Sequence, residues 1–599
     1  MKTNPSRLFS TISMVIIFSL LFSNLGSIVW FSSDASDAQK YLNNGLSLVQ
    51  NSDDTAAIEA FTQAIALEDS LSQAHLERAK LYFKQQDYNM AQEDLNAVLN
   101  LQPDNAEAYQ YRIQISLLEE NGTMALSDFA KLVALKPTEI QTFLLGGKIF
   151  LLTGEYARAA GNFTSVLNLQ RNYPEAQLGR AEAYLNLGDF DKAMQDINVI
   201  LKMDRQNIKA LTIRGQIYYN QEQYTSALQD WQNAIDIHGN SADLSTRCGK
   251  AYFNLKEYKK AISNWDAAIE LDPQQASIYA LRAKAHAQLG EADLALADLE
   301  KANQLSPQNP EILADLGLLY LQKSDLDKAI KAYDQAILKA PKEPMLYFRR
   351  GNAYRENNQL PEAIQDFSKS IELDPQNSDY FNNRGIAYMD NGEYALAQAD
   401  FQAAIQLNPS YALALINSSI LYIQTNQIPK ALEQLNQVLE QTDAYPVAFD
   451  FRAQAYFLTK EYPSAIKDWE TLLTYQPDSA VTYDWIGRSY IAMKEYKLAI
   501  DALDQALALN PDLGDAYYQK GLALIEMKRY EESLSMLELA IKFKSNLDLA
   551  YFNRGVAQYN LNQTSLAIES FQKVLEVSEN AELISLSQQT LNQLGAEAK

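Results

Sequence analysis

One length of 34 residues recurs along this chain without a break. The copy from Ser378 to Tyr411 shows two amphipathic runs separated by a turn at Asn391 and Gly392, with Pro409 after the second run. Counted in both directions from Ser378 as position 1, the frame covers residues 38–581 as 16 units with no insertion or deletion. Apolar residues spaced by three and four predict two helices per unit. Two short helices cannot bury both apolar faces alone, so we expect successive units to stack.

Small and large residues occupy fixed positions of this repeat. Position 20 is alanine in 15 of the 16 units, and position 8 is small in 15 of 16. Position 24 is always large, as in Phe61, Trp231 and Phe401. Small residues facing bulky ones at a constant spacing predict helices that pack closely against each other.

The prolines mark the predicted helix boundaries. Sixteen of the 17 prolines fall at position 1, 18 or 32 of the repeat. Proline is tolerated in the first turn of a helix and beyond its last turn, but not in its interior. We therefore expect the first helix to begin at position 1, and the second to begin near position 18 and to end before position 32.

The sequence resembles the tetratricopeptide repeat family. That family carries an apolar or aromatic residue at position 4, Gly or Ala at 8, Tyr at 11, Ala at 20 and 27, Phe at 24 and Pro at 32. The unit that begins at Ser378 matches this pattern with Phe381, Gly385, Tyr388, Ala397, Phe401, Ala404 and Pro409. The resemblance implies an all-α fold, a right-handed α-solenoid superhelix of helix-turn-helix units. We divide the chain into an N-terminal segment 1–37, sixteen repeats over 38–581, and a C-terminal capping helix with a tail over 582–599.

Position 7 departs from the family, which usually has leucine there. It is arginine in nine units, and in eight of these position 23 is aspartate. We interpret these residues as structural ion pairs that join the two helices of one unit. The pairs are Arg78 with Asp94, Arg112 with Asp128, Arg180 with Asp196, Arg214 with Asp230, Arg282 with Asp298, Arg350 with Asp366, Arg384 with Asp400, and Arg452 with Asp468.

The first 37 residues lie outside the repeat. Lys2 and Arg7 precede 26 residues without a charge, from Leu8 to Ser33. A run of this length can cross a bilayer, and positive charge before it favours an N-terminus in the cytoplasm. The segment predicts a signal-anchor, that is, a single transmembrane helix that holds the repeats outside the cytoplasm. The alternative is a cleaved signal peptide and a secreted protein.

Charge and composition narrow the function. A net charge of -24 argues against binding to nucleic acid, which requires clustered Lys and Arg. Every residue of 38–581 has a place in the helical repeat, which leaves no segment to build a catalytic domain. The three histidines, His75, His238 and His286, lie in different units at different positions. We therefore expect no catalytic activity, no cofactor and no metal site, and we interpret Cys248 as a core thiol.

The resemblance also implies which residues could bind a partner. In the family, the first helix of each unit lies on a concave face, and positions 2, 5, 6, 9, 12 and 13 of the repeat contact the ligand. Chaperone-binding members use a lysine at position 5, and this chain has none there. Its richest polar cluster at such positions is Arg349, Asn352 and Arg355 in one unit, with Asn382 and Asn383 in the next. Guanidinium and amide donors suit a peptide carboxylate or backbone. The alternative is a solvated groove wall.

Aromatic residues occupy the same positions farther along the chain. Trp485 and Tyr518 are candidate contact residues for a partner, together with Phe451, Phe552 and Tyr559. The alternative is that several of them pack between units.

The sequence thus predicts a non-catalytic scaffold that binds peptide or protein partners in the concave groove, outside the cytoplasm. Two alternatives stay open. The array could be an accessory subunit of an envelope enzyme or polysaccharide export complex, or a cytoplasmic adaptor of the co-chaperone kind.

Overall fold

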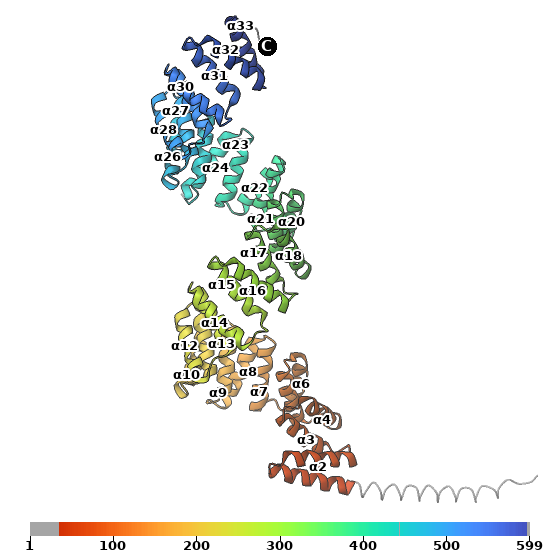
Figure 1. The fold of residues 1–599 in the computed structure, drawn as a ribbon. Coiled ribbons are helices and arrows are strands. Elements are labelled where there is room, and N and C mark those ends of the chain that lie inside the picture. Colours follow the sequence, from red (N-terminus) through yellow and green to blue (C-terminus); the bar gives the residue numbers. More distant parts are fainter. Residues whose placement is uncertain (1–34, 443, 596–599) are drawn as a thin grey trace, which may run out of the picture. The chain divides into compact units, whose positions relative to one another are not determined.

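The computed structural model describes residues 35–442 and 444–595, and within these ranges it contains helices and turns but no strand (Figure 1). The chain divides between Leu305 and Ser306 into two compact units. A helix over the described residues 35–50 precedes α2.

The helices of the first unit are α2 (Asp54–Leu67), α3 (Ser72–Lys84), α4 (Tyr88–Leu101), α5 (Ala106–Leu118), α6 (Gly122–Leu135), α7 (Ile140–Leu152), α8 (Tyr156–Leu169), α9 (Pro174–Asn186), α10 (Phe190–Met203), α11 (Ile208–Asn220), α12 (Tyr224–His238), α13 (Ala242–Asn254), α14 (Tyr258–Leu271), α15 (Ala276–Gln288) and α16 (Ala292–Leu305).

The helices of the second unit are α17 (Pro310–Gln322), α18 (Leu326–Lys339), α19 (Pro344–Glu356), α20 (Leu360–Leu373), α21 (Ser378–Asp390), α22 (Tyr394–Leu407), α23 (Ala412–Gln424), α24 (Ile428–Gln441), α25 (Val447–Leu458), α26 (Tyr462–Tyr475), α27 (Ala480–Ala492), α28 (Tyr496–Leu509), α29 (Gly514–Glu526), α30 (Tyr530–Lys542), α31 (Leu547–Asn560), α32 (Thr564–Val577) and α33 (Ala581–Gln593).

These helices alternate in two kinds, which we call A helices and B helices. An A helix such as α21 covers positions 1–13 of the repeat, and the B helix that follows it, here α22, covers positions 17–30. Within each compact unit, an A helix packs against its own B helix, and that B helix packs against the A helix of the next repeat. The predicted all-α solenoid of helix pairs is confirmed.

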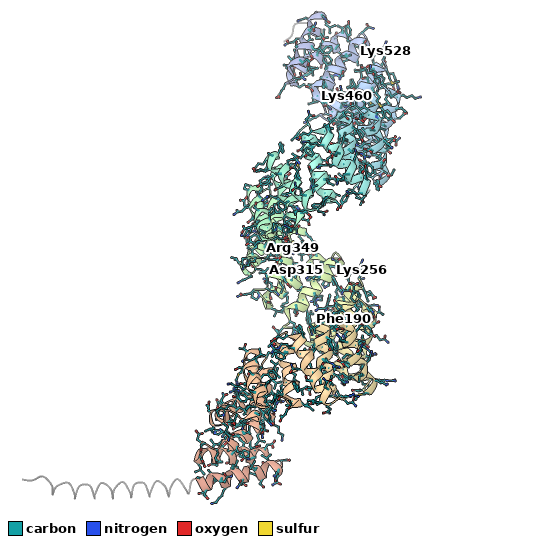
Figure 2. All side chains as sticks on the ribbon, turned by 180° about the vertical axis from the view of Figure 1, so that it is seen from behind. Phe190, Lys256, Asp315, Arg349, Lys460 and Lys528 are labelled. Carbon is teal, nitrogen blue, oxygen red and sulfur yellow. The ribbon has the colours of Figure 1, made fainter. Side chains whose placement is uncertain are left out.

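The turn between an A helix and its B helix has one conformation throughout. The residue at position 15 has a φ of 55° to 79° in all sixteen copies, in the left-handed region. Four of these residues are glycines, namely Gly154, Gly188, Gly290 and Gly392. The other twelve carry side chains, and Figure 2 labels three of them, Lys256, Lys460 and Lys528. A left-handed residue just past a helix lets the chain reverse and satisfies the last carbonyls of the helix. This turn sets the antiparallel pairing of the two helices.

The core consists of the small and large positions predicted from the sequence. Phe401 and Ala397 of α22 are fully buried. A Cβ atom built on Gly385 of α21 would lie only 2.7 Å from Phe401 Cε1. The ring at position 24 therefore fills the space that a missing side chain leaves at position 8. This contact lets the helices of a pair approach closely.

All eight predicted Arg–Asp pairs form, and each is bidentate. The arginine Nε and one terminal nitrogen donate to the two aspartate oxygens over 2.6–2.8 Å. The aspartates are only 3–6% exposed. Each pair thus fixes the A helix to the B helix at a buried point.

The same arginines also reach the preceding repeat, which the sequence did not reveal. In seven of the eight, the remaining guanidinium nitrogen donates to position 25 of the previous B helix, as Arg384 does to Ser368 over 3.0 Å. The seven acceptors are Thr62, Asn96, Thr164, Asp266, Asp334, Ser368 and Asn436. One side chain at position 7 therefore connects three helices and two repeats.

The predicted localisation requires a correction. No helix within residues 35–442 and 444–595 has the length and apolar character needed to cross a bilayer. The uncharged run that suggested a signal-anchor, Leu8 to Ser33, lies outside these described residues. We therefore withdraw the prediction of a single-pass membrane protein with extracytoplasmic repeats.

Candidate partner-binding site

The A-helix face is the surface formed by positions 2, 5, 6, 9, 12 and 13 of the A helices. Within the second unit it carries the predicted polar cluster. Arg349, Asn352 and Arg355 lie on α19, and Asn382 and Asn383 lie on α21, a helix that contacts α19. The structure therefore brings these five residues to neighbouring helices.

Most of the amides in this cluster already have protein partners. Asn382 is 3% exposed, and its Oδ1 accepts a hydrogen bond from Asn417 Nδ2 of α23 over 2.9 Å. Asn383 Nδ2 donates to the backbone carbonyl of Asp379 in its own helix. These two asparagines therefore form hydrogen bonds within the protein, one between A helices and one within its own helix. The arginines remain the groups with spare donors, because Arg355 Nε has no hydrogen-bond partner among the described residues and Arg349 forms no ion pair with them.

The predicted aromatic residues lie on other helices and pack against their neighbours. Trp485 of α27 stacks on Trp469 with ring centroids 5.6 Å apart, and the Arg488 guanidinium lies over its face. Tyr518 of α29 is only 7% exposed, and its hydroxyl accepts a hydrogen bond from Asn553. Tyr559 is 54% exposed. Trp485 and Tyr518 therefore contribute to packing between repeats, and they are separated from the polar cluster by α23 and α25.

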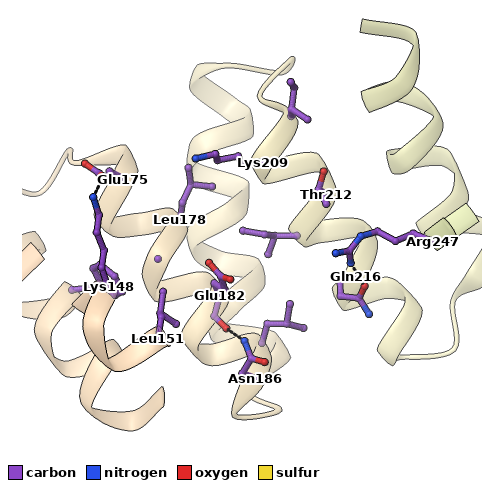
Figure 3. A pocket seen from close by; sticks show the side chains of 15 residues that line it. Lys148, Leu151, Glu175, Leu178, Glu182, Asn186, Lys209, Thr212, Gln216 and Arg247 are labelled. Atoms are coloured by element: carbon purple, nitrogen blue, oxygen red, sulfur yellow. Dashed lines mark hydrogen bonds and ion pairs between the residues drawn. The ribbon is translucent and has the colours of Figure 1, made fainter. Parts of the chain in front are cut away.

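The clearest cavity on the A-helix face is in the first unit, and we call it the α9 pocket (Figure 3). It has a volume of about 510 Å³ and is bordered by α7, α9, α11 and α13. Its apolar lining consists of Leu151, Phe163, Leu178, Leu185, Ile208 and Ile213.

A glycine opens this pocket. Gly179 holds position 6 of its repeat, and a methyl group there would overlap the Phe163 ring that rises from α8. The same ring fills the space beside Gly147 at position 8 of the preceding A helix, where a built Cβ would lie 2.5 Å from Phe163 Cε1. A position-24 ring thus lies between two successive A helices. Because position 6 lacks a side chain here, the ring becomes the floor of a recess.

Charged groups surround the apolar floor. Lys148 pairs with Glu175 at one end of the view in Figure 3, and at the other end Arg247 donates to Gln216 Oε1. Lys209 forms no ion pair with any residue that the structure describes. The Glu182 side chain is partly exposed to solvent. Burial of its carboxyl against the pocket walls raises the carboxyl pKa, and the nearby charges of Lys209 and Arg247 oppose this rise.

Sequence reasoning missed the α9 pocket because an absent side chain creates it. The available signal was Gly179 at position 6, next to Leu178 and Leu185 at positions 5 and 12. The pocket lining contains no histidine, cysteine or serine. Over the described parts of the chain, no group of three or more His, Cys, Asp or Glu side chains is arranged to hold a metal ion.

Family models match several stretches of the chain. The C-terminal domain of cilia and flagella-associated protein 70 matches residues 158–407, and subunit 3 of the anaphase-promoting complex, or cyclosome, matches 459–540. Tetratricopeptide repeat models match residues 72–105, 388–455 and 549–580. None of these models is that of an enzyme family. No curated protein matches the chain significantly.

Solved structures of repeat proteins are similar to parts of this chain. The Cut9–Hcn1 heterotetramer of the anaphase-promoting complex matches with 16% identity and a TM-score of 0.38, covering 76% of this chain and 96% of that one. Yeast Tom70 matches with 16% identity and a TM-score of 0.34, covering 71% and 96%. YrrB, described as a TPR protein with an unusual peptide-binding site, matches with 23% identity and a TM-score of 0.28, covering 31% and 95%.

Proposed function

The chain is built from tetratricopeptide repeats, and we propose that it is a non-catalytic scaffold that binds an extended partner peptide on its A-helix face. The observation that carries this proposal is the α9 pocket, a recess of about 510 Å³ with an apolar floor and a polar rim. Pockets that bind ligands tend to be concave and mostly apolar, with a few polar groups that orient what enters.

The shape and charge of the pocket define the occupant that we propose. Phe163 and Leu178 line the recess with apolar atoms, which suit a large apolar side chain such as leucine, methionine or phenylalanine. Lys209 stands at the rim with an ammonium group that has no ion pair among the described residues. An acidic residue next to the apolar one would complement that charge. The proposed ligand is therefore an extended peptide in which a large apolar residue adjoins Asp or Glu.

Selection from a random peptide library on the purified full-length chain tests this proposal. We expect the selected peptides to combine a large apolar residue with a neighbouring acidic one. The Leu178→Glu variant should bind them at least about tenfold more weakly, because it places a charge on the apolar floor. Lys209→Glu should weaken binding by a smaller factor, mainly at low salt.

The control is Lys131→Glu, which makes the same charge change at an exposed site on α6, away from the pocket. Helical circular dichroism and thermal unfolding establish that each variant is folded. Selected peptides that bind folded Leu178→Glu as tightly as the parent would contradict the proposal.

A further inference from the structure

A second place on the A-helix face has the same construction as the α9 pocket but a different chemistry. In the α9 pocket, the position-24 ring of Phe163 lies between position 8 of its own repeat and position 6 of the next. In the second unit, Tyr333 of α18 holds position 24 and Arg349 of α19 holds the following position 6. A Cβ built on Gly317 would lie 2.7 Å from Tyr333 Cζ, so this ring occupies the corresponding space. Its hydroxyl group lies close enough to Arg349 for the guanidinium charge to act on it.

The Tyr333 hydroxyl lacks a hydrogen-bond partner, which is unusual for a polar atom at position 24. The side chain is fully buried, and Oη has no partner among the described residues. The indole nitrogens at the same position all have one: Trp231 and Trp265 donate to backbone carbonyls of Thr212 and Thr246, and Trp469 donates to Asp450. Buried polar atoms are nearly always satisfied, so an orphan needs an explanation.

The charged groups that act on this hydroxyl are the Arg349 guanidinium and the Asp315 carboxylate. Arg349 forms no ion pair with the described residues, and Arg355, nearly two turns farther along α19, has an unpartnered Nε. A terminal nitrogen of Arg355 forms an ion pair with Asp390 over 3.7 Å, which leaves the Nε donor without a partner. Asp315 of α17, labelled with Arg349 in Figure 2, is occupied by an interaction of its own. The Tyr333 hydroxyl and Arg355 Nε thus remain donors without an acceptor among the described residues, in a chain whose net charge is -24.

The hydroxyl remains a donor over the neutral pH range. Burial raises the pKa of Tyr333 to about 12. The Arg349 charge opposes this rise, and the Asp315 carboxylate adds to it. A protonated phenol beside the Arg349 guanidinium offers hydrogen-bond donors and positive charge, and the hydroxyl has no acceptor among the described residues. The complementary chemical group is an anion with two acceptor oxygens.

We propose that Tyr333, Arg349 and Arg355 form a binding site for the carboxylate of an Asp or Glu side chain within an extended partner peptide. The Arg349 side chain, which no ion pair holds in place, turns onto the incoming carboxylate and exposes the Tyr333 hydroxyl to it. Position 5 of this A helix is Phe348, so the site does not depend on the lysine that chaperone-binding repeats use. The A-helix face continues over α17 on one side of the site and over α21 on the other. A bound peptide can therefore extend in both directions, which suits an acidic residue within the peptide better than its C-terminal carboxylate.

Binding of simple synthetic peptides to the full-length chain tests this site. The probe is a short fluorescent peptide of alternating Glu and Ala, acetylated and amidated at its ends, and the control peptide has Gln in place of Glu. We expect the Glu peptide alone to bind, and to bind more weakly as salt increases. Arg349→Gln should weaken binding about tenfold and Tyr333→Phe about fivefold, because each removes one donor to the carboxylate. Lys331→Gln on the exposed face of α18 is the matched charge control and should leave the affinity unchanged.

A stability measurement accompanies the binding assay. Because the Tyr333 hydroxyl is buried without a partner, Tyr333→Phe should unfold at the same temperature as the parent or higher. Loss of binding without loss of stability supports the proposal.

Three results would overturn it. These are lower stability of Tyr333→Phe, equal affinity of the Glu peptide for the parent and both variants, and equal binding of a Gln peptide with a free C-terminus. The Leu178→Glu variant should bind the Glu peptide normally, so failure here and failure of the α9 pocket proposal can be told apart.

Discussion

At the residue scale, the arginine at position 7 links the repeats through one side chain. Arg384 donates to both oxygens of Asp400 and also to Ser368 in the previous B helix. The hydrogen bond to Asp400 raises the pKa of Arg384, while burial opposes that change. A buried charge pair is costly to break, because the remaining partner is left uncompensated.

Replacing Asp400 with alanine tests this role. We expect the Asp400→Ala variant to lose about 3 kcal/mol of local stability, because the Arg384 guanidinium then lacks its partner in a buried place. The measurement is native-state hydrogen exchange of amides in α21 and α22. Glu576→Ala, which breaks the exposed pair of Lys573 with Glu576, is the control and should leave the hydrogen exchange of the surrounding amides nearly unchanged. Equal effects of the two variants would show that the Arg384 pair is not effectively buried.

His75 adds a pH-dependent contact of the same kind. Its Nδ1 lies 2.8 Å from Asp94 Oδ1, and its Nε2 lies 3.2 Å from the Asp69 carbonyl oxygen. The hydrogen bond to Asp94 raises the pKa of His75 above its ordinary value of 6.5, and burial opposes this. When folding raises the pKa of a group, protonation of that group stabilises the folded state. This contribution is complete below the pKa of the unfolded state and is lost as pH rises through the pKa of the folded state.

We therefore expect His75→Gln to lower the unfolding temperature relative to the parent more at about pH 5.5 than at about pH 9. Thermal unfolding of both proteins across this range provides the measurement, and taking the difference between them removes the titration of other groups. A deficit that grows with pH would have the wrong sign and would reject this interpretation.

At the element scale, the left-handed residue at position 15 controls each helix pair. Glycine adopts this conformation without strain, whereas a residue with a side chain pays roughly 1 kcal/mol. Gly392 has a φ of 79° and open space where its Cβ would be, so only backbone strain decides the effect of a substitution there. Gly161, in the middle of α8, also faces open space but is helical.

These two glycines should respond in opposite directions to the same change. We expect Gly392→Ala to destabilise the protein by about 1 kcal/mol, because alanine is strained in the left-handed region. Gly161→Ala should stabilise it by about 0.5–1 kcal/mol, because alanine is the better helix former. Denaturant unfolding of the two variants checks both values. A change of the same sign in both would mean that the conformation of the turn does not limit stability.

The sequence predicted the elements better than it predicted their contacts. Helix boundaries followed from the prolines, and the buried pairs followed from Arg at position 7 with Asp at position 23. The third contact of these arginines was missed because its acceptor at position 25 varies among Thr, Ser, Asn and Asp, which carry no common pattern. Tyr518 shows the same limit, since a position on the A-helix face can also be covered by the next repeat.

At the scale of the whole molecule, stability comes from contacts between neighbouring repeats. Within each of the two compact units, the helices pack mainly against those next to them in sequence, and no strand pairing joins distant segments among the described residues. A chain of this kind tolerates changes in the number of repeats but not in their phase.

Deleting whole and partial repeats tests this property. Removal of residues 378–411 joins position 34 of one repeat to position 1 of another, so we expect a shorter protein that unfolds cooperatively near the parent temperature. Removal of residues 378–394 takes away an A helix, exposes the apolar face of α22, and should lower the unfolding temperature or cause aggregation. Circular dichroism and light scattering on both deletions make the comparison. Identical behaviour would contradict the repeat frame.

The candidate sites could be predicted only in part from the sequence. Arg349 and Arg355 could be selected by their positions, but the orphaned Tyr333 hydroxyl became visible only when the packing of position 24 against position 6 was known. The α9 pocket depends on the same packing, with glycine in place of arginine. Both sites therefore arise from one structural rule that a single repeat does not display.

Photo-crosslinking tests the central claim that partner peptides bind to the A-helix face. A photoreactive phenylalanine analogue is placed either at residue 209, on the rim of the α9 pocket, or at residue 131, on the exposed surface of the B helix α6. Each protein is irradiated with a peptide selected on the parent chain. We expect crosslinks from residue 209 that excess unlabelled peptide suppresses, and none from residue 131. Crosslinks from residue 131 alone, or equally from both, would contradict the account.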